Sequence, residues 1–394
     1  MDLTAEVLLT ALADTAADAG VTIRSTLEPL AGPYAPVKPA VYAGGQYQLD
    51  RRWDDTVDPP EPADAVVIDN VPSQANRLEA ALELLREQVG LPQLVLDLAD
   101  VGSLPPHLPR ALSSFRFPHR QADAYLRDSD RDGQPFAKTE VGRSLLEATA
   151  DNPDGLLAWF PQALLFGFWQ SHVGKRSQAK LARSWVSEIV GYRPAAVDTR
   201  VLGLKGDPLN LSVEEPVDVA EPDDEGSWVL VAGQKRAGGK RERLSEIGHG
   251  QVPVNPADAA LGGVSFQRIE QRATVSFASL RRIRSSSAES SAAARALLVA
   301  MGVAAHVTAF GRGFNLRSGC DLRPVSSTWT WVGAEMKPVS QPTTQSAVAL
   351  IRDCVERAER AGLPVGSRWA AEPLRLTPKA NLAEAIRRTW PSYD

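Results

Sequence analysis

A strand–helix–strand pattern near the start of the chain constrains its fold most strongly. Residues 65–68 form a short apolar run, and the stretch after Ser73 repeats apolar residues at helical spacing until Gly90. A serine suits the N-cap of a helix, and a glycine suits the residue that ends one. The repeating positions are Leu78, Leu82, Leu85 and Val89. With the apolar run 94–98 as the next strand, the pattern predicts a β-α-β unit.

A second unit of the same kind is expected near the other end of the chain. Residues 272–277 alternate polar and apolar side chains, as a half-buried strand does. We expect a helix over 289–301, ended by Gly302, and then a strand over 304–310. Two β-α-β halves separated by a long excursion predict an α+β fold with a ferredoxin-like core and a large insertion.

Charge and cysteine content limit the class of protein. The formal net charge of −5 argues against a generally basic binder, although the acidic residues are concentrated in 207–225. Cys320 and Cys354 lack the spacing of a zinc module, which fits a reducing compartment. Residues 1–20 lack the basic start of a signal peptide, and no apolar run is long enough to span a membrane. We expect a soluble cytoplasmic protein without a metal or other cofactor.

Residues 164–191 are predicted to contain a helix with two different faces. We expect it to begin after Ser177 and to end at Gly191. Its apolar face would carry Leu181, Trp185 and Ile189, and its opposite face Arg176, Lys180, Arg183 and Ser187. The opposite face has no carboxylate to pair with its cations, so it suits anions. A solvated face with stray charges is the alternative.

Nucleotide-loop and metal-site motifs are weakly supported. Gly174–Lys175 lacks the partners that GxxxxGK[ST] requires, because Trp169 and Arg176 stand at those positions. The run DSDRDG at 128–133 opens like a calcium loop, but its twelfth position is Thr139, so a polar turn is favoured. The histidines and cysteines match no metal or nucleophile signature.

Two further basic clusters favour nucleic-acid binding. The stretch 233–253 combines glycines with cations, and such a loop can follow a phosphate backbone. Its basic residues are Lys235, Arg236, Lys240, Arg241 and Arg243. Arg281, Arg282 and Arg284 form another cluster after the strand 272–277. Ordinary surface positions remain the alternative for both. Basic clusters without a catalytic constellation favour a nucleic-acid-binding scaffold over an enzyme.

Several stretches, in one order along the chain, resemble a single known family. They are VYAGGQYQLDRRW (41–53), VVIDNVPSQANRLEAAL (66–82), FPHRQADAYLRDS (117–129), LLFGFWQSHVGK with SWVSEIVG (164–191), LSEIGHGQVP (244–253) and LRSGCDL (316–322). They are similar to the RAMP-superfamily backbone protein of type I-G (formerly I-U) CRISPR systems, the GSU-type counterpart of the repeated "Cas-seven" subunit of Cascade.

The resemblance implies an RRM-like, ferredoxin-like palm with inserted finger- and thumb-like elements. Members of that family stack as a helical filament along one CRISPR guide RNA and present it for pairing with target DNA. They are not known for catalysis of their own. The implied partners are guide RNA, target DNA through pairing, further copies of the chain, a large subunit, a fused Cas-five/Cas-six-type subunit and a helicase–nuclease, with no membrane.

We expect one domain over 1–394 on this basis. Its palm would cover about 41–100 and 270–335, with insertions over about 101–269 and a helical C-terminal part over about 336–394. A chain of this length with 43% hydrophobic residues can bury a sizeable core.

A subunit that holds any guide should bind phosphate and 2′-hydroxyl groups and leave the base edges to pairing. The basic and polar side chains within or near the matching stretches are therefore the predicted RNA contacts. They are Arg51, Arg52, Asn76, Arg77, Lys175, Arg176, Lys180, Arg183, Lys235, Arg236 and Lys240. Two rival functions remain open. One is a metal-dependent ribonuclease that uses Asp128, Asp130, Asp132 or the acids of 207–225, and the other is a structural oligomer independent of RNA.

Overall fold

The computed structural model describes most of the chain, in two compact units. The described residues are 1–102, 104–105, 107–170, 180–197, 199–200, 208–209, 211, 216–219, 228–230, 241–249, 260–369 and 372–389. The first unit comprises Met1–Tyr42, Tyr47–Ala195 and Val264–Ser392, and the second comprises Ala43–Gln46, Ala196–Gly263 and Tyr393–Asp394. The predicted site residues that lie outside the described residues are Lys175, Arg176, Lys235, Arg236 and Lys240.

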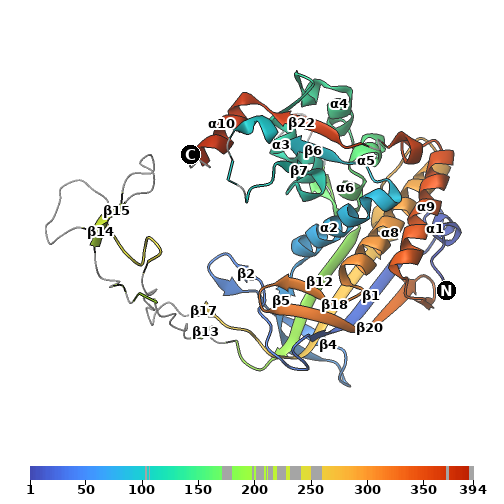
Figure 1. Cartoon of the computed structure of the whole chain (residues 1–394). Coiled ribbons are helices and arrows are strands. Elements are labelled where there is room, and N and C mark those ends of the chain that lie inside the picture. The colour runs from blue at the N-terminus through green and yellow to red at the C-terminus, as the bar shows by residue number, and fades with distance from the viewer. Residues whose placement is uncertain are drawn as a thin grey trace. The chain divides into compact units, whose positions relative to one another are not determined.

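An antiparallel eight-stranded sheet forms the base of the first unit (Figure 1). Its strands follow the order β19-β20-β1-β18-β12-β5-β4, and β21 also pairs with β20. The bounds are β1 Gly20–Pro29, β4 Leu49–Asp54, β5 Glu61–Asp69, β12 Trp185–Pro194, β18 Phe266–Ser276, β19 Phe314–Arg317, β20 Cys320–Val332 and β21 Met336–Val339. A small hairpin of β2 (Val41–Tyr42) and β3 (Gln46–Tyr47) lies outside this sheet.

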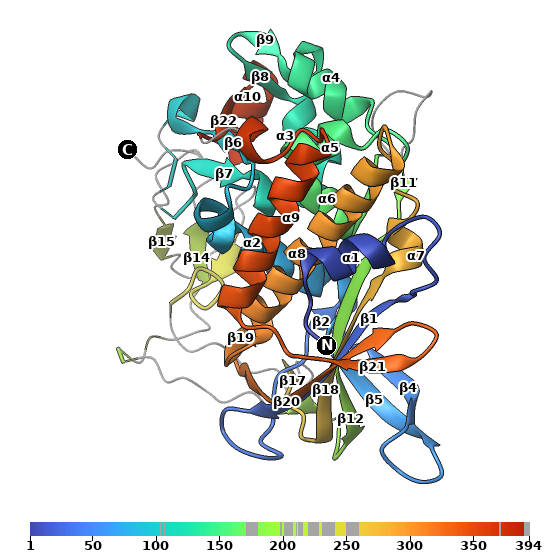
Figure 2. The ribbon, with the colours of Figure 1, turned by 90° about the vertical axis from the view of Figure 1, so that its right-hand side faces the viewer.

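Helices α2 (Val71–Val89) and α8 (Ala288–Phe310) cover one face of this sheet, and α1 (Ala5–Ala11) and α9 (Thr344–Arg360) pack against α8 (Figures 1 and 2). The short α7 spans Phe277–Leu280. Alternate side chains of the strands point into this interface, because successive residues of a strand face opposite ways. Val21, Ile23 and Trp185 are among the side chains buried there.

Helix α8 is a core helix. A serine pair, Ser287 and Ser290, forms a capping box at its start. Its length and hydropathy would allow it to cross a membrane, but 89% of its most apolar window is buried inside the protein. His306 on this helix contacts the rings of Trp185 and Trp329 on the sheet. Burial lowers the pKa of His306 to about 3, so the ring is neutral in the folded protein.

The other face of the sheet carries paired charges. The Glu270 carboxylate is 2% exposed and accepts hydrogen bonds from Arg24, Arg268 and Arg272. Arg268 also pairs with Asp54, at 2.9 Å. Arginine charges on this face are thus neutralised by carboxylates within the sheet.

A second sheet of five strands, in the order β7-β6-β22-β8-β9, lies in the same unit. Its strands are β6 Leu94–Asp97, β7 Ala111–Ser113, β8 Ser129–Arg131, β9 Gln134–Pro135 and β22 Leu374–Pro378. The helices near it in sequence are α3 Ala124–Arg127, α4 Glu140–Leu146, α5 Asp154–Trp159, α6 Pro161–Phe166 and α10 Ala380–Thr389. One-turn 3-10 helices span Ala99–Val101, Ser114–Arg116, Arg120–Ala122, Phe136–Lys138 and Gly366–Arg368.

The second unit contains short antiparallel pairings in its described part. β14 (Pro216–Val219) pairs with both β15 (Trp228–Leu230) and β16 (Arg241–Arg243). β13 (Thr199–Arg200) pairs with β17 (Ala260–Leu261).

The mixed α+β class predicted from the sequence is confirmed, but several predicted elements are wrong. The predicted strand 304–310 is the end of helix α8. The predicted helix after Ser177 is instead, over its described residues, the strands β11 (Lys180–Leu181) and β12. The predicted strand at 94–98 exists as β6. However, β6 pairs in the second sheet, so it does not form a β-α-β unit with α2 and a strand of the central sheet.

The residue ranges predicted for the palm do not include every strand of the central sheet. β1 and β12 are both central strands, yet they lie outside the ranges predicted for the palm. The C-terminal part, predicted to be helical, also contributes the strands β21 and β22.

Candidate nucleic-acid interface

A groove of about 550 Å³ opens beside the pairing of β10 (Phe168–Trp169) with β11. Pro118, His119, Arg120 and Ala122 form another part of its lining. The lining combines cations with aromatic rings, and the side chains that give it this character are His119, Arg120, Phe166, Trp169, Lys180 and Arg183. We call it the basic groove.

Two cations of the basic groove are available to a ligand. Lys180 and Arg183 are exposed, and neither makes an ion pair with a residue that the structure describes. The Lys180 Nζ lies 5.6 Å from the centroid of the Trp169 ring, which is 59% exposed. Partial burial of its guanidinium lowers the pKa of Arg183, and the nearby charge of Arg120 adds to this effect. An anion in the groove would relieve the repulsion between these cations.

A buried ion pair fixes the wall of the basic groove. The guanidinium of Arg120 donates to both oxygens of Glu79, each at 2.8 Å, and to the Gly167 carbonyl at 3.0 Å. Glu79 lies on α2, and its carboxylate is 3% exposed. Burial raises the pKa of Glu79, and the charge of Arg120 opposes that rise. Since Gly167 immediately precedes β10, this pair ties the groove to helix α2.

Gly167 is required where the groove turns. Its φ is 76° and its ψ is 165°, a backbone region used almost only by glycine. A Cβ there would lie 2.7 Å from the Leu181 carbonyl oxygen. The turn therefore lets β10 approach β11 closely enough to close the base of the groove.

The predicted contacts on β4 lie elsewhere in the unit. Arg51 is exposed, and its side chain makes no ion pair with the described part of the chain. Arg52 pairs with Asp50 at 2.8 Å and with Glu188.

The predicted contacts on α2 differ in their surroundings. Arg77 donates to Asp69, which is fully buried, at 2.9 Å and to the Leu316 carbonyl at 2.9 Å. Asn76 is exposed and lies one helical turn before Glu79, on the same side of the helix. Of the described predicted residues, Lys180 and Arg183 are brought together in one groove.

The acidic run at 128–133 forms a turn between β8 and β9. Asp132 has a φ of 51° and Gly133 one of 74°, as a tight hairpin requires. Asp128 pairs with Arg127 at 2.6 Å, which lowers the pKa of that carboxyl. Among the described residues, no group of His, Cys, Asp or Glu side chains has the arrangement of a metal site. The polar-turn interpretation of this run is confirmed.

Sequence reasoning missed three residues of the groove: His119, Arg120 and Trp169. The stretch 117–129 was singled out for its resemblance, but nothing in its pattern places it beside β10. The signal that could have found Trp169 is its position between an apolar run and a basic one.

Residues 21–195 match the model of a protein family described as CRISPR-associated protein GSU0053. This part of the chain is therefore similar to a CRISPR-associated family. The resemblance predicted from the sequence is thereby confirmed at the level of the family. No curated protein matches the sequence. The solved structure of Csc2 from Thermofilum pendens is similar at 9% identity and a TM-score of 0.28, over 87% of this chain and 74% of Csc2. A likeness at that level adds nothing to the assignment.

The basic groove lies within the region that matches the GSU0053 family. Glu79, Arg120, Gly167 and Arg183 all fall between residues 21 and 195. The chemistry of the groove suits a single-stranded nucleic acid, because cations hold phosphates while an exposed aromatic ring stacks on a base.

Proposed function

We propose that this protein is a non-catalytic backbone subunit of a type I-G CRISPR effector complex that holds the guide RNA by its sugar-phosphate chain. The basic groove supports this proposal most directly, because it combines an exposed tryptophan with two cations that make no ion pair with the described residues. Such a surface grips a backbone without selecting a sequence, as a subunit that must accept any guide requires. The protein would act in the cytoplasm, with copies stacked head to tail along one guide.

We further propose that the central sheet and its helices are the ferredoxin-like palm. Four strands of the sheet lie in the order β20-β1-β18-β12. Along the chain, α2 lies between β1 and β12, and α8 lies between β18 and β20. That arrangement is two β-α-β halves with interleaved strands, and both helices lie on one face. The segment between β12 and β18, which contains Ala196–Gly263 of the second unit, would then be the thumb-like insertion.

RNA binding with a charge-matched control tests the proposed function. Lys180→Ala combined with Arg183→Ala should weaken binding of a single-stranded RNA oligonucleotide. If each cation contacts one phosphate, the slope of log affinity against log salt should flatten by about 1.4. Arg360→Ala combined with Arg388→Ala removes the same charge from exposed helix positions that are paired with Glu356 and Glu384. That control should leave the slope unchanged, and equal slopes for both double variants would contradict the proposal.

The ribonuclease alternative makes a different prediction. Incubation of the assembled complex with complementary RNA and magnesium or manganese should leave the RNA intact if the subunit is a scaffold. Regularly spaced cuts that disappear in Asp128→Asn would instead establish the ribonuclease. Uniform filaments from nuclease-treated protein without nucleic-acid absorbance would favour the RNA-independent oligomer.

A further inference from the structure

Arg120 differs from Lys180 and Arg183, the other two permanent cations of the basic groove. Its side chain is only 9% exposed, and its charge is paired with the Glu79 carboxylate. Its backbone has a φ of 54°, in the left-handed region that a residue with a side chain rarely adopts. Strained backbone of this kind persists where the surrounding structure imposes it, and it is frequent at functional sites. The strain indicates that the position of this guanidinium has a role besides packing.

Stability alone does not account for the Glu79–Arg120 pair. Replacing a buried ion pair by apolar side chains of similar volume is often neutral or stabilising. The pair also requires the strained backbone at Arg120. A role toward the ligand of the groove explains both the buried charges and the strain.

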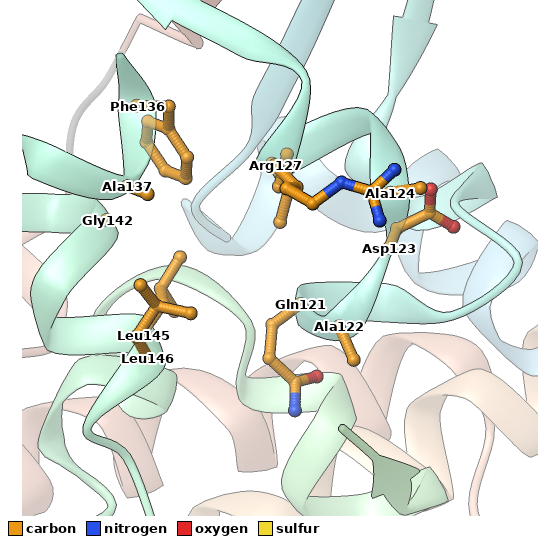
Figure 3. Close-up of a pocket in the computed structure, with 11 residues that line it drawn as sticks. Gln121, Ala122, Asp123, Ala124, Arg127, Phe136, Ala137, Gly142, Leu145 and Leu146 are labelled. Atoms are coloured by element: carbon orange, nitrogen blue, oxygen red, sulfur yellow. The ribbon is translucent and has the colours of Figure 1, made fainter. Parts of the chain in front are cut away.

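The segment that follows Arg120 borders an open space on its other side. Residues 121–127 face residues 136–146 across a cavity of about 190 Å³ (Figure 3). Phe136 and Leu145 are among the side chains that line this cavity. Packing from that side is therefore incomplete, and the hydrogen bonds of Arg120 to Glu79 and Gly167 hold its guanidinium in the groove wall.

Gly167 brings Arg120 and Arg183 close together. The Arg120 Nη1 donates to the Gly167 carbonyl at 3.0 Å, and a Cβ added at Gly167 would lie 2.9 Å from the Arg183 backbone nitrogen. Burial of its guanidinium and the charge of Arg120 lower the pKa of Arg183, whereas the charge of Glu79 raises it. Both members of the buried pair thus act electrostatically on Arg183, and they act in the same way on a phosphate bound beside it.

The described residues that line the basic groove include no carboxylate. The Glu79 carboxylate is 3% exposed and lies behind this lining. Its negative charge still offsets that of Arg120, because the two side chains share two hydrogen bonds of 2.8 Å. A strand in the groove is then attracted by two uncompensated cations, Lys180 and Arg183, although three cations line it.

We propose that Glu79 is a positioning residue that sets the strength of phosphate binding in the basic groove. It holds the Arg120 guanidinium in the groove wall and cancels its charge. This inference rests on the proposed function, because it concerns how tightly the groove holds a sugar-phosphate chain. Each further cation strengthens binding to every nucleic acid, so the pair limits the hold of the groove on strands other than the guide.

Binding of one single-stranded RNA oligonucleotide over a range of salt concentrations tests the role of Glu79. Glu79→Gln keeps the shape of the side chain but leaves the Arg120 charge uncompensated. The slope of log affinity against log salt should steepen by about 0.7, the value for one more cation on a single strand. The variant should therefore bind about fivefold more tightly than the wild type at about 0.1 M salt and equally at about 1 M. Glu356→Gln removes the same charge from an exposed pair with Arg360 and should leave the slope unchanged.

A second variant removes the whole pair, so the test holds even if Glu79→Gln does not fold. Glu79→Leu combined with Arg120→Met replaces two opposite charges by apolar side chains, and the fold should persist. Since the pair presents no net charge to the groove, this double variant should bind RNA with the slope of the wild type. A slope flattened by about 0.7 would show that Arg120 acts as a full cation in the wild type, and it would overturn the inference.

The outcomes separate this inference from the proposed function. A merely structural Glu79 would lower stability without changing the slope, so a folded Glu79→Gln variant with the wild-type slope would overturn the inference and leave the groove intact. The proposed function fails, and this inference with it, if the wild-type protein does not bind the oligonucleotide or if Lys180→Ala with Arg183→Ala leaves the slope unchanged. Circular dichroism of each variant checks that the fold is kept.

Discussion

Removing the carboxylate of the buried Glu79–Arg120 pair should destabilise the protein far more than removing an exposed one. Arg120 has a side chain only 9% exposed, and Glu79→Ala would leave its charge without a carboxylate. Breaking a buried pair by removing one partner costs about 3–5 kcal/mol, since the other charge stays buried. The Gly167 carbonyl, at 3.0 Å, would remain as a neutral partner and cannot offset the charge.

Helix α2 offers a control on the same face. Glu83 lies one turn after Glu79 and pairs with Arg116 at 2.9 Å, but the Arg116 side chain is 68% exposed. Glu83→Ala should therefore cost only about 0–1 kcal/mol. Urea unfolding followed by tryptophan fluorescence measures both free energies. Glu79→Leu combined with Arg120→Met should restore most of the loss, because apolar side chains replace a buried pair without a desolvation penalty. A cost for Glu79→Ala no larger than that for Glu83→Ala would refute this reasoning.

Two other predictions concern single positions. Gly167→Ala should lower the free energy of unfolding by at least about 1–3 kcal/mol, because an alanine is strained at a φ of 76° and its Cβ would lie 2.7 Å from the Leu181 oxygen. Gly133→Ala is the control, because Gly133 has a φ of 74° but no atom within 4 Å of the new Cβ. Its loss of stability in thermal unfolding should therefore be smaller. His306 has a folded pKa of about 3, below its unfolded value, so the stability from keeping it neutral is present above about pH 6.5 and is lost as the pH falls. Between pH 7 and pH 4 the wild-type protein should lose roughly 3 kcal/mol more than His306→Leu in urea unfolding, and equal losses would contradict the pKa.

The helix predicted after Ser177 is a strand because its apolar spacing fits both structures. The apolar positions 181, 185 and 189 recur every four residues, and four is a multiple of the strand period as well as close to the helical one. Pairing with β18 makes this segment a strand, because Trp185 and Ser187 lie opposite Val275 and Ala273 of that strand. Such a pattern cannot distinguish the two structures when a strand partner lies far along the chain.

Gly302 was interpreted as the end of a helix, yet it stands in the middle of α8. A Cβ at this position would lie 2.4 Å from the Trp185 ring, so the glycine lets the helix approach the sheet. A glycine can end a helix or allow a neighbour to approach it closely, and the sequence alone does not show which neighbour comes close. The strand β1 was missed although Val21, Ile23 and Leu27 alternate with polar residues.

Pairing of charges decides which cations can hold a phosphate, and a sequence does not reveal it. Arg77 and Lys180 are both basic residues in matching stretches, so composition ranks them equally. In the structure, Asp69 is fully buried and is held by Arg77 and Arg317 together. Drawing Arg77 toward a phosphate would take one of two cations from a fully buried carboxylate, which is unfavourable. Lys180 gives up no carboxylate of the described residues, because its contact there is with the Trp169 ring. A phosphate would therefore bind the cations of the basic groove before it bound Arg77.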